Sequence, residues 1–405
     1  MTAGRTELDV LPTAIFEGIR VVEASTVIAA PLSAAILGDF GADVIKIEDP
    51  RGGDPIRRLG PTFEGEATSS KVTNRNKRSV TINLGTERGR ELYIELVKTA
   101  DVVVTNFRVP TLRRWRIDYE DLRAVRPELV MMHLTGYGRS GPYQDRPGFA
   151  RVAEAFSGLT YMSGHADGPP LFAGYAVGDG LAGVYGAFSL SAALLHRERT
   201  GEGQLIDLAL YEPMLRIIES LIVDYDLLGI VPRRTGNQNP AVAPSSIYRT
   251  SDDRWITIPA STQQMWERLC RALDVPDLMD DQRYCDNRSR ISHRDALDRR
   301  IDELVAERSF AELEHVFGAH DVAYGSVNSV VDIVNDPHII ERRNLVRASD
   351  KGETGVLMQA PVPRFSSTPG SIRSVGPEAG DHTDEVLSSV CGLDAEALTR
   401  LRSDG

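Results

Sequence analysis

The sequence predicts an α/β protein, with an open, doubly wound parallel sheet and a second, smaller α+β domain. Two observations lead to this prediction. In the first half of the chain, short β-rich runs alternate with helical segments, as in βαβ units with right-handed crossovers. Beyond about residue 225, amphipathic helices follow one another with few strands between them. The length of 405 residues suits two domains, or one large domain with a smaller insert.

The first expected βαβ unit lies near the N-terminus. Residues 19–24 (IRVVEA) predict a strand, a small-residue helix (LSAAILGDF) stops at Gly41, and residues 44–48 (VIKIE) predict the next strand. The alternation continues with a strand at 79–84, a helix from Glu87, and strands at 102–105 and 129–134. Because the strands of such units run parallel, ligands are expected at the carboxyl ends of the strands.

The second region begins with an expected strand at 255–260 (WITIPA). Three helical segments follow, with apolar residues three and four apart and charged residues opposite them: QQMWERLCRAL, RDALDRRIDELVAERS and FAELEHVFGA. We therefore expect a large domain over residues 1–224, a small α+β domain over 225–330, and a segment over 331–405 that returns to complete the large domain.

Composition excludes several classes of function. A net charge of −12 repels DNA and anionic membranes, so neither nucleic acid nor a membrane is an expected partner. Three cysteines and eight scattered histidines offer no disulfide framework and no ligand spacing for a metal. The N-terminal residues lack the apolar core of a signal peptide, and the longest apolar run, 181–195, is short for a membrane span. These features favour a soluble, cytoplasmic protein.

Two motifs near residue 135 have ordinary interpretations. GYGRSG (136–141) matches G-x-G-x-x-G after a strand, but Pro142 and Tyr143 follow it, so we expect a loop rather than the helix of a dinucleotide site. His133 lies inside an apolar strand and is expected to be a hydrogen-bonded core residue.

A basic cluster, NRNKRS (74–79), precedes one strand, and further arginines lie near other strand ends at 57, 58, 108, 113 and 114. For any one of these residues, solvated surface charge is the better interpretation. The alternative is phosphate binding, because Asn106 and Phe107 follow the strand at 102–105, where ligands are expected.

Asp179 begins the long apolar segment AVGDGLAGVYGAFSLSAALLHRERTGEGQ, which predicts a buried helix that stops at Gly201. Gly180, Gly183 and Gly186 lower its helix propensity, and close approach of another helix or chain is the expected compensation. Two roles remain open for Asp179, and both can hold together. It is an N-cap, or it is a nucleophile that the helix N-terminus keeps ionised.

Several ordered motifs make the chain similar to the family III CoA-transferases, which include formyl-CoA and carnitine CoA-transferases. The similarity covers nearly the whole chain and is carried by GIRVVEASTVIAAP, GADVIKIEDPRGGD, NKRSVTINL, ADVVVTNF, LTGYGRSGPY, RTGEGQLIDLALYE, NDPHI and DHTDEVL. The resemblance implies a Rossmann-like, CoA-binding large domain and an interlocked homodimer. It also implies acyl-CoA and a small carboxylic acid as substrates, with no permanently bound cofactor.

The resemblance places Asp179 on the catalytic aspartate of the family. This carboxylate would attack a donor thioester, and CoA would pass through aspartyl anhydride and aspartyl-CoA thioester intermediates to an acceptor acid. The positions that correspond to CoA contacts are Ile28, Ala29, Arg51, Ile82, Leu84, Asn106, Phe107, Arg114, Gly136 and Tyr137. Arg51 is included because Asp49 stands where related enzymes have a basic residue beside CoA.

Two other functions remain open. An α-methylacyl-CoA racemase has the same fold, but Phe149 occupies the position of the racemase histidine and cannot exchange a proton. A non-catalytic CoA-binding protein would use Asp179 only as a helix cap. The departures from formyl-CoA transferases, which include Ile28 in place of a glutamine and Gly85 in place of a lysine, argue against formate or oxalate as the substrate.

Overall fold

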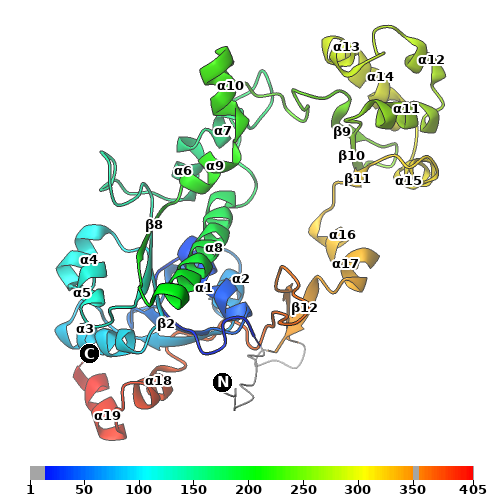
Figure 1. Cartoon of the computed structure of the whole chain (residues 1–405). Coiled ribbons are helices and arrows are strands. Elements are labelled where there is room, and N and C mark those ends of the chain that lie inside the picture. The colour runs from blue at the N-terminus through cyan, green and yellow to red at the C-terminus, as the bar shows by residue number, and fades with distance from the viewer. Residues whose placement is uncertain (1–13, 350–354, 405) are drawn as a thin grey trace, which may run out of the picture. The chain divides into compact units, whose positions relative to one another are not determined.

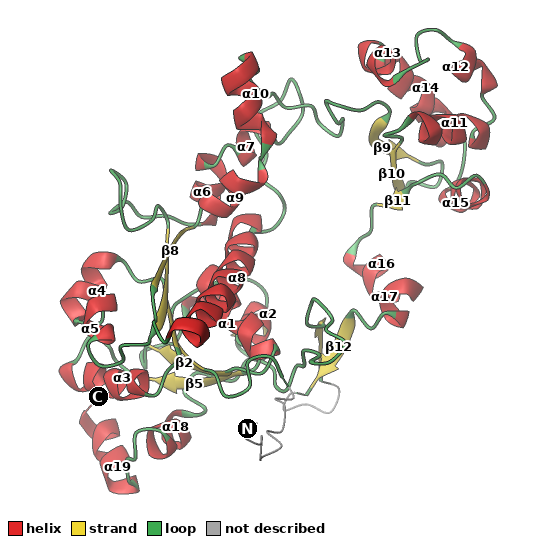
Figure 2. Cartoon of the chain, viewed as in Figure 1, coloured by secondary structure: helices red, strands yellow, loops and turns green. Residues whose placement is uncertain are grey.

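The computed structural model describes residues 14–349 and 355–404. The described chain divides into two compact units. Figure 1 colours the chain by residue number, and Figure 2 colours it by secondary structure. The larger unit contains residues 14–159, 173–223, 342–349 and 355–404, and the smaller contains residues 160–172 and 224–341.

A six-stranded parallel sheet forms the centre of the larger unit. Its order is β5-β2-β1-β6-β7-β8, so the direction of progression reverses between β1 and β6. The strands are β1 (Arg20–Ala24), β2 (Asp43–Glu48), β5 (Lys77–Thr81), β6 (Val102–Thr105), β7 (Val130–Thr135) and β8 (Leu205–Ala209). The predicted parallel sheet is confirmed, and β8 joins it as a strand that the alternation pattern did not indicate.

The strand expected at 79–84 is displaced toward the N-terminus. β5 ends at Thr81, because Asn83 starts a turn in which its side chain accepts the Gly85 N–H at 3.0 Å and its carbonyl accepts the Thr86 N–H at 3.1 Å. Ile82 and Leu84 therefore lie in the loop beyond the carboxyl end of the strand, where a ligand can reach them.

One face of the sheet is covered by α1 (Ala29–Asp39) and α8 (Val177–Thr200), which lie side by side in Figure 1. Glycines permit this close approach. A Cβ at Gly183 would lie 2.7 Å from Leu32 Cδ2, and a Cβ at Gly186 would lie 2.2 Å from Ser33 Oγ. The expected helix–helix contact is thus confirmed for two of the three glycines, whereas Gly180 faces open space.

The opposite face is covered by α3 (Glu87–Lys98), α18 (Thr383–Ser389) and α19 (Ala395–Asp404), whose buried residues share one apolar cluster with alternate residues of the strands. Thr383 Oγ1 accepts the Thr81 N–H at 3.0 Å, so the C-terminal segment bonds to the end of β5. The remaining elements of this unit are η1 (Pro55–Arg58), β3 (Thr62–Phe63), β4 (Glu66–Ala67), α2 (Thr68–Thr73), α4 (Val109–Trp115), α5 (Tyr119–Arg123), α6 (Ala150–Phe156), α9 (Glu212–Ile217), β12 (Leu345–Ala348) and β13 (Val356–Gln359).

The smaller unit packs helices against a three-stranded antiparallel sheet, drawn yellow in Figure 2. Its core contains Trp266, Leu269 and Phe317. The strands are β9 (Ser245–Arg249), β10 (Trp255–Pro259) and β11 (Gly325–Ser326), and the helices are α11 (Gln263–Ala272), α12 (Pro276–Asp280), α13 (Asn287–Ser292), α14 (Arg294–Ala306), α15 (Phe310–Ala319), α16 (Val330–Asn335) and α17 (Pro337–Glu341). Two short helices, α7 (Leu159–Met162) and α10 (Ser220–Leu228), span the boundaries between the units.

Among the described helices, α8 alone is long and apolar enough to cross a membrane by length and composition. Half of its most apolar stretch is buried inside the protein. This is weak support for a membrane span, because core helices of globular proteins meet the same criteria.

The interpretation of the basic cluster as solvated surface charge is wrong for several of its residues. Lys77 is fully buried and lies 2.6 Å from Glu23, and Arg75 pairs with the buried Asp39. Arg57 is also buried and lies 2.6 Å from Glu48. These cations neutralise carboxylates inside the unit, so they are not available to bind phosphate.

Substitution by alanine should have opposite effects on stability at Gly186, which packs against α1, and at Gly180, which faces open space. Gly186→Ala should lower the free energy of unfolding by about 1–3 kcal/mol, because the new methyl group would collide with Ser33 and with Met132 Sδ at 2.9 Å. Gly180→Ala should raise it by about 0.5–1 kcal/mol through helix propensity. Urea denaturation measures both values, and equal shifts in the two variants would contradict this account of the contact.

Candidate active site

Asp179 lines a cavity of about 260 Å³ in the larger unit. The cavity lies at the carboxyl ends of β1, β6 and β7, between the first turns of α1 and α8. Four other residues expected at the site, Ile28, Ala29, Asn106 and Gly136, line the same cavity. In open α/β sheets, ligands bind where the strand order reverses, and here that place is between β1 and β6.

The expectation that Asp179 caps the helix is wrong. The N-cap residue of α8 is Ala176, and Asp179 is the third residue of the helix. Glu154 of α6 takes the capping role from a distant part of the chain, because its Oε1 accepts the Gly178 N–H at 3.0 Å. Within residues 14–349 and 355–404, the carboxylate of Asp179 accepts no hydrogen bond. It is left free to react.

The surroundings of Asp179 favour its ionised form less than the helix N-terminus alone would, although a pKa of about 6 leaves the carboxylate mostly ionised at neutral pH. Burial raises the pKa of Asp179 from 3.8 to about 6, and repulsion from the Glu154 carboxylate contributes to the rise. Glu154 is itself buried and lies 2.9 Å from Arg151. The negative charge of Glu154 at the N-terminus of α8 weakens the positive potential of the helix dipole there. That potential would otherwise favour ionisation of Asp179.

Asn106 holds the loop that connects β1 to α1. Its side-chain oxygen accepts the Thr26 N–H at 3.0 Å, and its amide donates to the Thr26 carbonyl at 2.8 Å. The loop leads directly to Ile28 and Ala29, which begin α1. Asn106 thus couples the carboxyl ends of β6 and β1 at the wall of the cavity.

A second cavity, of about 290 Å³, is lined by four more of the expected residues, Arg51, Ile82, Leu84 and Phe107. Thr26 lines both cavities, so the two adjoin. The Phe107 ring meets the Trp115 ring edge to face at 5.3 Å, and Trp115 also lines this second cavity. Arg51 is exposed and pairs with Asp49 at 2.7 Å. Apolar walls with a guanidinium at the rim suit a nucleotide.

Arg114 and Tyr137 line neither cavity. The Arg114 guanidinium lies 5.9 Å from the Trp115 ring centre, just outside the second cavity. The Tyr137 ring packs edge-on against Phe156 at 5.2 Å, in a cluster of rings beside α6.

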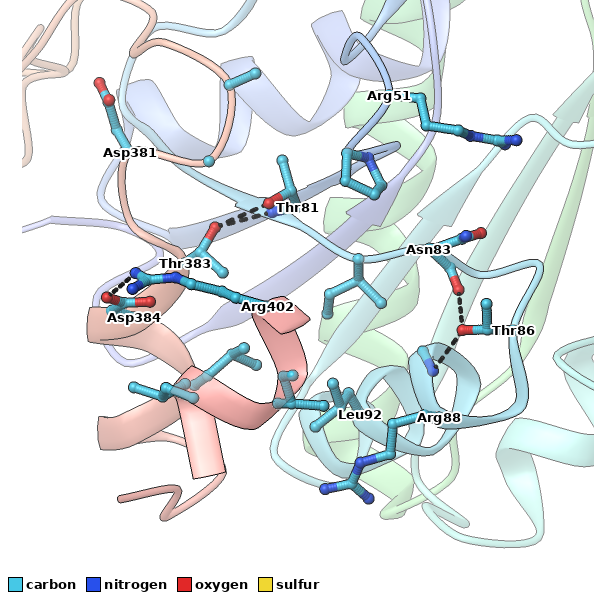
Figure 3. A pocket seen from close by; sticks show the side chains of 18 residues that line it. Arg51, Thr81, Asn83, Thr86, Arg88, Leu92, Asp381, Thr383, Asp384 and Arg402 are labelled. Carbon is cyan, nitrogen blue, oxygen red and sulfur yellow. Dashed lines mark hydrogen bonds and ion pairs between the residues drawn. The ribbon is translucent and has the colours of Figure 1, made fainter. Parts of the chain in front are cut away.

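A third cavity of the larger unit lies away from Asp179. It has a volume of about 810 Å³ and is bounded by α3, α18 and α19 (Figure 3). In this view Arg402 pairs with Asp384, and Thr383 bonds to Thr81. This cavity shares Arg51, Ile82 and Asn83 with the second cavity, so its rim adjoins the expected nucleotide site.

Sequence reasoning gave no role to Glu154 or Arg146. Arg146 lines the cavity of Asp179 together with Arg108, and its guanidinium lies 3.7 Å from the Tyr143 ring centre. The run of polar and turn residues after the strand at 129–134 was the available signal for Arg146. No local signal marks Glu154, because its contact with Gly178 joins residues 24 apart in sequence.

Two expectations about the neighbouring motif are confirmed. Residues 136–141 form a loop after β7, and the next helix, α6, begins at Ala150. His133 is fully buried, and its Nε2 lies 2.7 Å from the Phe107 carbonyl. Burial lowers the pKa of His133 to about 4, so it is a neutral core residue. The described residues contain no group of metal-binding side chains.

Comparison with known proteins identifies the protein family of this chain. The sequence profile of CoA-transferase family III matches residues 16–383. The chain is 41% identical over 391 residues to the β subunit of succinyl-CoA–L-malate CoA-transferase from Chloroflexus aurantiacus, covering 95% of this chain and 96% of that one. It is 34% identical over 383 residues to succinate–glutarate CoA-transferase from Agrobacterium fabrum, covering 92% and 95%. The crystal structure of a CAIB/BAIF family protein from Brucella suis is similar with a TM-score of 0.84 and 32% identity, covering 93% and 99%.

The chain belongs to CoA-transferase family III, as its motifs indicated. It is a CoA-transferase, and CoA thioesters and carboxylic acids fit as its substrates. The resemblance on which the expected site residues rested is thereby confirmed, whereas the individual roles of those residues stay predictions.

The pKa of Asp179 predicts the pH dependence of the enzyme. If Asp179 is the nucleophile, as the resemblance implies, it must be ionised to react, so kcat/KM for the acyl-CoA donor should rise with pH and reach half of its maximum near pH 6. Glu154→Gln removes the neighbouring charge, so the midpoint should move to lower pH while burial still holds it above the usual range. Initial rates between about pH 4.5 and 8 measure both midpoints. A midpoint that does not move would exclude Glu154 as a cause.

Proposed function

We propose that this CoA-transferase moves CoA from succinyl-CoA to a small dicarboxylic acid through covalent intermediates on Asp179. The observation that carries the proposal is the half-buried Asp179 carboxylate, which lines a cavity and has no hydrogen-bond partner among the described residues. A carbonyl carbon can reach it past Gly180, where a Cβ would meet no atom within 4 Å. The relatives named for malate and glutarate support the choice of acids.

The first half of the reaction loads CoA onto the enzyme. A carboxylate oxygen of Asp179 attacks the thioester carbonyl carbon of the donor, the C–S bond breaks, and the products are a mixed anhydride and CoA thiolate. The thiolate then attacks the aspartyl carbonyl carbon of the anhydride. The donor acid leaves as its carboxylate, and CoA remains bound to Asp179 as a thioester.

The second half of the reaction runs the same steps in reverse, with the acceptor acid in place of the donor acid. The acceptor carboxylate attacks the aspartyl thioester and expels CoA thiolate, which gives a second anhydride. The thiolate attacks the acyl carbon that came from the acceptor, and Asp179 leaves as a free carboxylate. No proton, water or redox equivalent is consumed, so one group that cycles between carboxylate, anhydride and thioester is sufficient.

Two neighbouring features fit the substrates of this reaction. Arg108 and Arg146 line the cavity of Asp179 and supply positive charge for the second carboxylate of a dicarboxylic acid. The adjoining second cavity offers Ile82, Leu84 and Phe107 as apolar contacts for adenine, with Arg51 as a partner for a phosphate. The predicted CoA contacts of Arg114 and Tyr137 would have to lie outside these two cavities.

The racemase alternative is disfavoured by the same cavity. Phe149 lines it and is two-thirds exposed, with 68% of its surface accessible. A phenyl ring neither accepts nor donates a proton, so no second base faces Asp179 from the position at which a racemase needs one.

Removal of the nucleophile is the direct test. Asp179→Asn should abolish transfer from succinyl-CoA to malate or glutarate, and hydroxylamine or borohydride trapping should modify Asp179 only in the wild-type enzyme. Because the native pKa of Asp179 lies above its unfolded value, ionisation weakens the fold progressively between about pH 4 and pH 6, and the full penalty is present above pH 6. Asp179→Asn should therefore be more stable than the wild type by up to about 3 kcal/mol at about pH 7.5, by about half of that at about pH 5, and by almost nothing at about pH 3.

Glu198→Gln is the matched control, since Glu198 is an exposed carboxylate at the other end of α8. It should retain both transfer and trapping. Transfer by Asp179→Asn at the wild-type rate, or an adduct on another residue, would refute the role of Asp179.

The position of Arg146 in the cavity leads to a prediction about how the acceptor acid is recognised. Arg146→Ala should raise KM for a dicarboxylic acceptor about tenfold or more, because it removes the cation that faces the second carboxylate. Butyrate, which lacks a second carboxylate, should be used equally poorly by both enzymes. Steady-state kinetics measure this, with Arg123→Ala, an exposed arginine of α5, as the control. An equal loss for both acids would contradict the assignment.

The homodimer and the cytoplasmic location stay predictions. The exposed apolar side chains of Val184, Phe188 and Leu195 on α8 would suit a subunit contact. Sedimentation velocity on the purified protein tests the homodimer.

A further inference from the structure

The loop between β1 and α1 contains a strained residue at the edge of the cavity. Val27 has φ +71°, which is the left-handed region that β-branched residues avoid. Val27 lines the cavity of Asp179, and Ile28 and Ala29 follow it. Such a conformation persists only where the surroundings hold it, and it is typical of functional loops.

Asp54 holds Val27 in this conformation. Its two carboxylate oxygens accept the Val27 N–H at 3.0 and 3.2 Å, and Oδ1 also accepts the Ile56 N–H at 2.9 Å. Asp54 is 2% exposed and belongs to the segment after β2. A buried carboxylate with several backbone donors is fixed in position, so the backbone bound to it is fixed as well.

Lys46 compensates the charge of Asp54. The Lys46 Nζ lies 2.9 Å from Asp54 Oδ2 and 2.7 Å from Glu23 Oε1, and it also donates to the Ser25 carbonyl at 3.1 Å. Lys46 therefore bonds both to the residue that holds the loop and to the first residue of the loop. Because both side chains are almost fully buried, removal of the Lys46 charge would leave the Asp54 carboxylate without the cation that lies against it.

Val27 directly precedes Ile28, the N-cap residue of α1. The N–H groups of Ile28 and Ala29 donate no hydrogen bond to any residue within 14–349 or 355–404, and no side chain caps this helix. Both residues line the cavity that Asp179 lines. Fixed N–H donors beside a carbonyl under attack stabilise the negative charge that develops on its oxygen.

We propose that Asp54, supported by Lys46, is a positioning residue for CoA transfer. It holds Val27 in the left-handed conformation and thereby fixes the free N–H groups of Ile28 and Ala29 against the thioester carbonyl that Asp179 attacks. This inference rests on the transfer function proposed for Asp179. Asp54 itself does not contact the substrate.

A variant pair at Asp54 and Val27 tests the inference. In Asp54→Asn, the amide group faces Lys46 and one acceptor oxygen is lost, so the loop should loosen. We expect kcat to fall about 10- to 100-fold while KM for succinyl-CoA changes less than about threefold. In a Val27→Gly background, Asp54→Asn should lower kcat only about threefold, since glycine adopts a positive φ without strain.

Amide hydrogen exchange on the whole protein provides a readout that is independent of activity. Exchange of residues 25–29 should be faster in Asp54→Asn than in the wild type. Asp39→Asn is the matched control, because Asp39 is 3% exposed and ion-paired at the far end of α1. It should lower thermal stability without a change in kcat or in the exchange of residues 25–29.

Asp54→Glu serves as the second variant, since it keeps the charge beside Lys46 and displaces the carboxylate from the Val27 N–H. It should show the same loss of kcat even if Asp54→Asn does not fold. The positioning role would be overturned if Asp54→Asn lowered kcat equally with and without Val27→Gly, or if folded Asp54 variants kept an unchanged kcat. Absence of transfer by the wild-type enzyme would instead overturn the proposed function on which it rests.

Discussion

The contact between α1 and α8 is the constraint on which the rest of the site depends. Gly183 lies against Leu32 and Gly186 against Ser33, so the two helices approach more closely than side chains would allow. Ser33 Oγ donates to the Gly183 carbonyl at 3.0 Å, which fixes their register. Both helices then begin beside the same cavity, one with free N–H groups and the other with Asp179. The glycines therefore act at a distance from the reaction, through the place where each helix starts.

Asp179 differs from Glu23, Asp54 and Glu48, three buried carboxylates of the larger unit, because no cation lies beside it among the described residues. Glu23 and Asp54 each lie within hydrogen-bond distance of a buried lysine, and Glu48 pairs with Arg57. Burial opposes ionisation of Glu48, but its bonds to Arg57 outweigh that effect and lower its pKa to about 2. Asp179 has burial without a cation, and its pKa rises to about 6. A carboxylate that is poorly stabilised by its surroundings is a better nucleophile than one held in an ion pair.

The sequence indicates local structure and motifs well, and tertiary contacts poorly, for physical reasons. β-branched runs such as 102–105 predict buried strands directly, and β6 has those bounds. The motif resemblance located Asp179, but its place at the start of the helix suggested a cap, and in the structure Ala176 is the N-cap residue and Glu154 bonds to the N–H of Gly178. Lys77 looks like a surface residue in sequence because its partner, Glu23, lies far earlier in the chain. Burial of charge depends on partners from other elements, which no local pattern contains.

The proposed covalent mechanism would also constrain which acids the enzyme exchanges. Under the proposed mechanism, the leaving acid and the entering acid are bonded in turn to the same carboxyl group of Asp179, so both must fit one cavity of about 260 Å³. Arg108 and Arg146 line that cavity for either acid. A donor without a second carboxylate would leave these cations without their partner during the first half-reaction, as an acceptor without one would during the second. Under the proposed mechanism, one cavity lined by two arginines would therefore favour exchange between two dicarboxylic acids, since selectivity for the donor and selectivity for the acceptor would arise from the same side chains.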